Sequence, residues 1–172
     1  MTNDKPRIVA DGDDRVLSDF EFSMIVSVNG FLQWVVHCAE AAGARGLSSL
    51  DVLVLHMVNH RARDKKLSDI CLVMNIEDTH TVAYSLKKLE EQGYVKHKHN
   101  GRDRIYYSSA DGDIFCNTYR QIRRDNLVAA LEDEEADFEN IAKIAKAMTR
   151  IGRYYLHASR VALVSPTTKQ GS

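Results

Sequence analysis

Apolar side chains recur every three or four positions along most of the chain, which is the period of an amphipathic helix. From Leu17 to Ala44 this pattern predicts one long helix, because its apolar positions form a near-heptad stripe. These positions are Phe20, Met24, Val28, Phe31, Val35 and Cys38. Gly43 and Gly46 mark the end of the helix.

Three shorter helices are predicted next. The second, "SSLDVLVLHMVNHRA", begins with an approximate capping box made by Ser48 and Asp51. The third, "LSDICLVMN", has Ser68 as its expected N-cap, and Asp78 caps a fourth helix that ends at Gly93. The third helix is expected to bury Ile70, Cys71 and Met74.

The pattern then changes to the alternation of a β-hairpin. Tyr94 to His99 and Arg104 to Ser108 read as two strands joined by a loop centred on Asn100-Gly101. After Asp111 the helical period returns, with apolar residues at Phe115, Tyr119, Ile122, Leu127 and Leu131. A last helix is predicted from about Asp137 to Ser159, with a stripe through Phe138, Ile141, Ala145, Met148 and Tyr155.

This order predicts a central block that fills its own small core and outer helices that do not. The expected parts are a flexible N-terminal segment (1–17), a first helix (18–45), the central block (48–110), two later helices (111–160) and a flexible tail (161–172). The long apolar stripes of the outer helices need a partner surface. A second copy of the chain would supply it, so we expect a homodimer.

The fourth predicted helix has two distinct faces. Val82, Leu86 and Leu89 fall within a narrow arc that must face the core, with Leu72 and Tyr94 as expected neighbours. The opposite face carries His80, Tyr84, Lys87 and Lys88, with Thr79 and Thr81 in the first turn. Such a face suits the major groove of DNA, because N-terminal residues reach base edges while lysines meet phosphates.

The hairpin adds positive charge beside this helix. From Leu86 to Ser108 there are six cations, namely Lys87, Lys88, Lys96, Lys98, Arg102 and Arg104, against three acids, Glu90, Glu91 and Asp103. The whole chain of 172 residues has a net charge of −1, so its cations are concentrated here. Arginines of such a hairpin can bind the DNA backbone or a narrow minor groove. Exposed strands also carry lysine simply to prevent edge pairing, which is the alternative explanation.

No enzyme chemistry is indicated. The chain has no GxSxG motif, no phosphate-binding glycine loop and no carboxylate pair in a defined context. We expect no enzyme activity, no cofactor and no metal: His56 and His60 are spaced to share an ion, but no third ligand is evident. His97 and His99, on one face of their strand, are expected to add charge near DNA.

Cys38 and Cys71 are expected to be small core residues, whereas Cys116 is the better candidate for a thiol sensor. The odd number of cysteines, three, fits reduced thiols. The acidic N-terminus does not resemble a signal peptide, and no apolar run approaches membrane-spanning length. We therefore expect a cytoplasmic protein that does not bind membranes.

The stretch "LSDICLVMNIEDTHTVAYSLKKLEEQGYVKHKHNGRDRIYYSS" resembles the winged helix-turn-helix of MarR-family transcription regulators. The matching positions are Leu89, Glu90, Gly93, Tyr94 and Val95 at the end of the recognition helix, and Asp103 and Arg104 in the wing. With the flanking helices the resemblance covers roughly residues 18 to 158. It implies a mainly α (α+β) fold, in which a winged helix-turn-helix domain is flanked by long dimerisation helices.

The resemblance also implies a function. The protein would be a dimeric, sequence-specific DNA-binding transcription regulator, most often a repressor in this family, with recognition helices in successive major grooves of double-stranded DNA. By position, Thr79, His80, Thr81 and Tyr84 would face bases, and Arg102 and Arg104 would be the wing contacts. A small-molecule effector would bind a pocket lined by Trp34, His37 and Tyr119.

The sequence also departs from the family pattern, which keeps a second function open. Tyr84 occupies the position where many members carry an arginine, and the wing is slightly short. Together with the near-zero net charge, these departures fit a winged-helix protein-interaction module without DNA binding.

Overall fold

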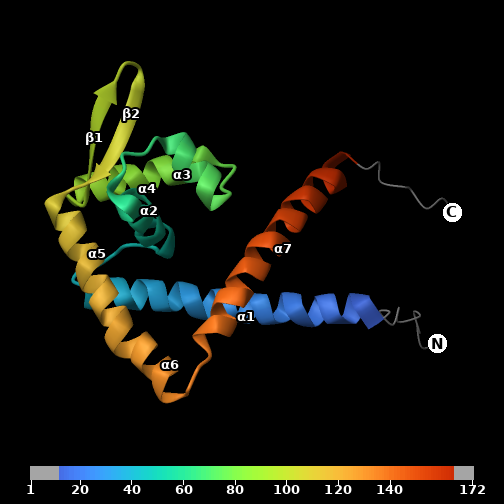
Figure 1. Ribbon diagram of the computed structural model, residues 1–172. Helices are drawn as coiled ribbons and strands as arrows, with labels where there is room; N and C mark the ends of the chain where they lie inside the picture. The colour runs from blue at the N-terminus through green and yellow to red at the C-terminus, as the bar shows by residue number, and fades with distance from the viewer. Residues whose placement is uncertain (1–11, 165–172) are drawn as a thin grey trace, which may run out of the picture. The chain divides into compact units, whose positions relative to one another are not determined.

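The computed structural model describes residues 12–164, and these residues are mainly helical (Figure 1). The helices are α1 (Gly12–Ala41), α2 (Ser49–Asn59), α3 (Leu67–Met74), α4 (Thr79–Glu91), α5 (Ala110–Arg123), α6 (Ala129–Asp133) and α7 (Phe138–Val164). A 3-10 turn (His60–Ala62) follows α2, and a π-helical turn (Arg124–Val128) follows α5. The strands are β1 (Val95–Asn100) and β2 (Asp103–Ser108). The chain divides into two compact units at Leu127/Val128, and each is described by itself.

The core of the first unit lies where α2, α3 and α4 meet. Val82, Leu86 and Leu89 of α4 are completely buried, which confirms the predicted inward arc. The same cluster includes residues from α1, β1 and α5, among them Val35, Cys38, Val95, Phe115 and Tyr119. The C-terminal part of α1 is therefore part of this core, while its N-terminal half extends away from the three helices (Figure 1).

The hairpin projects from this helical bundle as a two-stranded antiparallel sheet (Figure 1). Val95 pairs with Ser108 at its base and Asn100 with Asp103 at its tip, so the loop consists of Gly101 and Arg102. The predicted loop centre was one residue too early. Gly101 has φ +60°, a left-handed conformation that glycine adopts without strain.

Local hydrogen bonds set the helix starts. Ser48 and Asp51 form the predicted capping box of α2, and the Asp78 carboxylate accepts the His80 backbone N–H as the predicted cap of α4. The prediction for α3 was wrong: its N-cap is Lys66, whose backbone N–H donates to the Asp69 carboxylate. Ser68 lies inside the first turn instead.

Two further predictions need correction. Leu72 does not face the α4 arc, since its side chain is 77% exposed. Residues 12–17, expected in a flexible segment, are the first turns of α1, and α7 continues to Val164. The rest of the expected N-terminal and C-terminal segments, 1–11 and 165–172, lies outside the described residues.

The outer helices expose long rows of apolar side chains. In α1 these include Phe22, Ile25, Val26 and Phe31, and in α7 they include Ile141, Ile144, Met148 and Tyr154. No residue of α7 is buried within the described chain. By length and composition alone α1 could also cross a membrane, contrary to the sequence expectation, but the core helix of a soluble protein and a signal sequence pass the same test.

Candidate nucleic-acid interface

The outward face of α4 carries the side chains that the sequence assigned to DNA. Thr79, His80 and Thr81 are exposed in the first turn, and Tyr84, one turn later, is 71% exposed. The Thr81 hydroxyl donates to the Asp78 carbonyl oxygen at 2.8 Å, so its lone pairs remain free to accept. The face thus presents donors, acceptors and an aromatic ring to the solvent. Whether these residues contact bases stays a prediction.

The two lysines of this helix differ. Lys87 is 74% exposed and forms only a loose ion pair with Glu91, at 3.7 Å. Lys88 is 27% exposed, and its ammonium lies 2.8 Å from the Asp51 carboxylate and 2.8 Å from the Gly46 carbonyl oxygen. Lys88 is therefore directed toward α2. The sequence expectation had placed it on the outward face of α4, and this needs correction.

The cations of the β1–β2 hairpin, which is the wing, also differ from one another: among the described residues, one is paired with an acid and three are not. Lys98 pairs with Asp64 at 2.5 Å, so its charge is partly neutralised. Within residues 12–164, Lys96, Arg102 and Arg104 form no ion pair and no side-chain hydrogen bond. These three exposed cations extend from β1 through the loop to β2, and they are free to meet an anionic partner.

The wing histidines have neighbours of their own. His97 Nδ1 hydrogen-bonds the Glu90 carboxylate near the end of α4, which links this helix to β1. The His99 ring stands edge-on to His97, with centroids 5.4 Å apart. His97 is thus hydrogen-bonded to a carboxylate, whereas the sequence expectation was that it adds charge near DNA. Among residues 12–164, no group of three or more His, Cys, Asp or Glu side chains could hold a metal ion.

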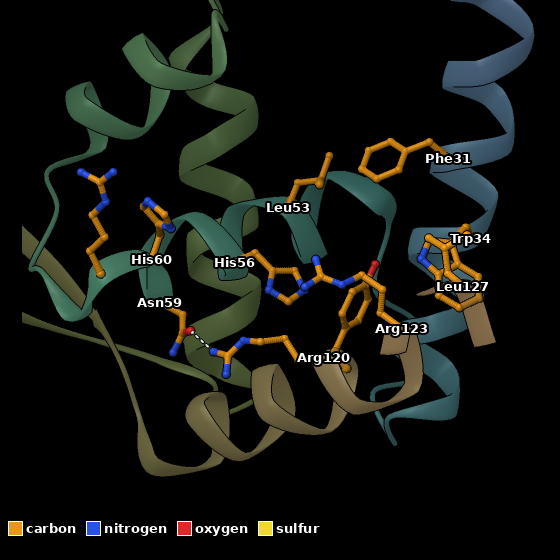
Figure 2. Close-up of a pocket in the computed structure, with 11 residues that line it drawn as sticks. Phe31, Trp34, Leu53, His56, Asn59, His60, Arg120, Arg123 and Leu127 are labelled. Atoms are coloured by element: carbon orange, nitrogen blue, oxygen red, sulfur yellow. Dashed lines mark hydrogen bonds between the residues drawn. The ribbon is translucent and has the colours of Figure 1, made fainter. Parts of the chain in front are cut away.

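A second feature of the first unit is a cavity of about 470 Å³ beside α2 and α5 (Figure 2). Phe31 and Trp34 of α1 and Leu53 of α2 supply apolar walls, and Arg120 and Arg123 of α5 supply positive charge. The remaining lining residues are His56, Asn59, His60, Arg61, Tyr119 and Leu127. Of the residues expected here, Trp34 and Tyr119 line the cavity, and His37 does not.

His56 is the unusual residue in this cavity. Its Nε2 atom is buried without a hydrogen-bond partner in the described chain, while its ring packs edge-on against Tyr119 with centroids 4.4 Å apart. Burial lowers the pKa of His56 to about 4, and the positive charges of Arg120 and Arg123 add to the effect. The imidazole is therefore neutral at pH 7, and its Nε2 atom has no hydrogen-bond partner within the described residues. No local sequence pattern indicates this, because α2 and α5 meet only in the fold.

A chain of hydrogen bonds leads from the cavity to the base of the wing. Arg120 donates to the Asn59 side-chain oxygen at 3.2 Å, as Figure 2 shows. The Asn59 amide in turn donates to Asp113 at 2.7 Å and to the Ser108 hydroxyl of β2 at 3.5 Å. One side chain of α2 thus connects a cavity arginine to the last residue of the wing.

The cysteines are all buried and reduced. Burial raises the pKa of Cys116 to about 12, so the thiol stays protonated. The expectation that Cys116 is a candidate sensor is not supported, since a reactive thiol needs exposure and a lowered pKa. Cys38 donates to the Tyr119 carbonyl oxygen at 3.7 Å and is a core residue, as predicted.

Comparisons with known proteins agree with this geometry. Residues 47–112 match the family model of the winged helix DNA-binding domain. No curated protein matches the sequence. The structure is similar to a mutant of MarR from E. coli complexed with operator DNA, with a TM-score of 0.63 and 13% identity over 83% of this chain and 99% of that one.

Two other solved structures are similar. FabT from Streptococcus pneumoniae in complex with DNA has a TM-score of 0.61 and 18% identity, covering 83% of this chain and 99% of that one. CouR from Rhodococcus jostii bound to p-coumaroyl-CoA has a TM-score of 0.58 and 17% identity, covering 78% and 93%. Residues 47–112 therefore match a winged helix DNA-binding domain, and the chain has the fold seen in solved MarR-family transcription regulators.

Proposed function

We propose that the protein is a dimeric, sequence-specific DNA-binding transcription regulator that represses by occupying its operator. The observation that carries this proposal is the set of exposed side chains on α4, namely His80, Tyr84 and Lys87, together with the cations of the wing that are unpaired within the described residues. MarR and FabT, two proteins with the same fold, were solved with DNA.

In this proposal α4 enters the major groove and the wing follows the backbone. Thr79, His80, Thr81 and Tyr84 face the bases, because they occupy the first turns of the exposed face. Lys87, Arg102 and Arg104 meet phosphates or the minor groove. Phosphate contacts strengthen binding to every DNA sequence, whereas base contacts strengthen binding to few. Substitutions should therefore distinguish the base-facing residues from the phosphate-facing ones.

The proposal is tested with Arg104→Ala against His80→Ala and Tyr84→Ala. Arg104→Ala should weaken binding to all duplexes and reduce the slope of log K against log salt by about one per subunit. His80→Ala and Tyr84→Ala should instead change base preference and leave that slope unaltered. If all three variants bind DNA as the unaltered protein does, the surface is wrongly assigned.

The exposed apolar rows of α1 and α7 support a homodimer. Helices with apolar faces of this length are stable in water when a second copy covers them. A soluble, cytoplasmic dimer also accounts for the apolar composition of α1, whose residues Val35, Cys38 and Ala39 are buried in the core. Sedimentation equilibrium should give twice the chain mass of 19.4 kDa, and Ile141→Asp should shift the population toward the monomer.

We assign the cavity to a small-molecule effector with an acidic group and an apolar body. Arg120, Arg123 and the free His56 nitrogen would bind the acid, and Phe31, Trp34 and Leu53 the apolar part. Trp34 is the single tryptophan, so its fluorescence reports binding. Titration with aromatic carboxylates, beginning with p-coumarate, should quench it, and Arg123→Gln should weaken the response; no change with any carboxylate would contradict this assignment.

The second candidate function, a protein-interaction module, rests on two cations that are paired with acids: Lys88, which was expected to face DNA, and Lys98 of the hairpin. It predicts that the purified protein retains no DNA while recovering one stoichiometric protein partner.

A further inference from the structure

A buried carboxylate lies directly behind the outward face of α4. Asp51 of α2 is 2% exposed, and its oxygens accept from the Ser48 backbone N–H at 2.8 Å, the Ser85 hydroxyl at 2.6 Å and the Lys88 ammonium at 2.8 Å. Burial acts to raise the pKa of Asp51, but hydrogen bonds from Lys88, Ser85 and Ser48 outweigh it and leave the pKa below its ordinary value. Asp51 is therefore a charged group held by α4 on one side and by its own helix cap on the other.

Lys88 belongs, by its position, to the stripe that faces DNA. It follows His80 and Tyr84 at intervals of four residues, so these three side chains leave the helix on one side. Lys87, the adjacent residue, points into solvent, whereas Lys88 turns back to Asp51 and to the Gly46 carbonyl oxygen. A flexible lysine released from these partners would have a reach sufficient for a phosphate beside Tyr84.

We propose that Asp51 is a specificity-determining positioning residue, which withholds Lys88 from DNA and, with Ser85, fixes the rotation of α4 on α2. This inference rests on the proposed function. A cation that meets phosphates strengthens binding to every sequence equally, and so lowers the ratio of specific to non-specific affinity. When one cation per subunit is kept away from phosphates, base contacts supply a larger share of the binding free energy.

The test uses Asp51→Asn, Lys88→Gln, the double variant and Lys87→Gln as the matched control. Each is measured in the full-length protein by fluorescence anisotropy on two labelled duplexes: a genomic fragment that the protein selects and a scrambled version. Salt is varied to obtain the slope of log K against log salt. This slope counts phosphate contacts and does not respond to a purely structural weakening.

Lys87→Gln should reduce the slope by about 0.9 per subunit, the value of one lost phosphate contact. Lys88→Gln should leave it unchanged, because glutamine can still donate to Asp51 and no phosphate contact is lost. Asp51→Asn frees Lys88, so it should steepen the slope by about the same amount as Lys87→Gln reduces it. It should also tighten binding to the scrambled duplex, and the double variant should return the slope to that of the unaltered protein.

A reduced slope for Lys88→Gln, equal to that of Lys87→Gln, would overturn the inference, since Lys88 would then be a phosphate contact. An unchanged slope and unchanged specificity ratio for Asp51→Asn would also overturn it. If Asp51→Asn fails to fold by circular dichroism, the Lys88→Gln and Lys87→Gln pair still decides. Absence of any DNA binding by the unaltered protein would instead overturn the proposed function.

Discussion

Lys65 and Tyr106 exchange two backbone hydrogen bonds, with N···O distances of 2.9 and 2.8 Å. They form an isolated antiparallel bridge that joins the loop before α3 to strand β2. The wing is therefore attached to the bundle through its backbone at mid-strand as well as through its two ends. The ion pair between Lys66 and Asp103 joins the same two segments, next to this bridge.

The Lys66–Asp103 pair should contribute little to stability. Both side chains are about half exposed, so water and salt screen their attraction. We expect Asp103→Asn to leave the urea midpoint of unfolding unchanged within error. A clear loss of stability would mean that the wing depends on this pair more than on the backbone bridge.

Leu86 and Leu72 provide a matched pair for the core. Leu86 is completely buried in α4, so Leu86→Ala should lower the free energy of unfolding by about 2–5 kcal/mol through lost burial and a residual cavity. Leu72 is exposed, and Leu72→Ala should change it by less than about 0.5 kcal/mol. Urea denaturation followed by circular dichroism measures both. Equal losses would show that Leu72 is covered in the native protein.

His56 should make stability fall in mild acid. Its pKa is lowered from 6.5 to about 4 in the folded chain, so between these values the unfolded state binds more protons than the native state. Stability is complete above pH 6.5 and decreases toward pH 4, by at most on the order of 3 kcal/mol. Urea midpoints at pH 7 and pH 5 measure the effect, and His56→Gln should make them more similar. An identical pH dependence in that variant would assign the effect elsewhere.

The cysteines should be inert in the native protein. Cys38, Cys71 and Cys116 are buried, and burial raises the pKa of each thiol. A disulfide reagent such as Ellman's should titrate none of them rapidly at pH 7.5, and all three in guanidinium chloride. Rapid reaction of one thiol without denaturant would restore the sensor hypothesis for it.

The inward arc of α4 could be predicted because that helix is long enough for the 3.6-residue period to separate two faces. The exposure of Leu72 could not be predicted, since α3 has only eight residues and most of them are apolar. In so short a helix the period does not distinguish the buried side from the exposed side. The cap of α3 was missed for a related reason, because its capping bond is donated by the Lys66 backbone N–H to the Asp69 carboxylate inside the helix.

The candidate site also has a part that could be predicted from the sequence and a part that could not. The exposed residues of α4 and the charged wing follow from local sequence, whereas the inward turn of Lys88 depends on Asp51, 37 residues earlier. His56 and Arg120 likewise meet in a cavity only because α2 and α5 pack together. Contacts of this kind have no signature in the spacing of residues.

Selection of genomic fragments with the purified protein at physiological salt tests most directly whether the protein reads DNA sequence. We expect sequencing to recover a few fragments sharing an inverted repeat, with half-sites about one helical turn apart. Recovery of no DNA, or of fragments without a common sequence, would contradict it.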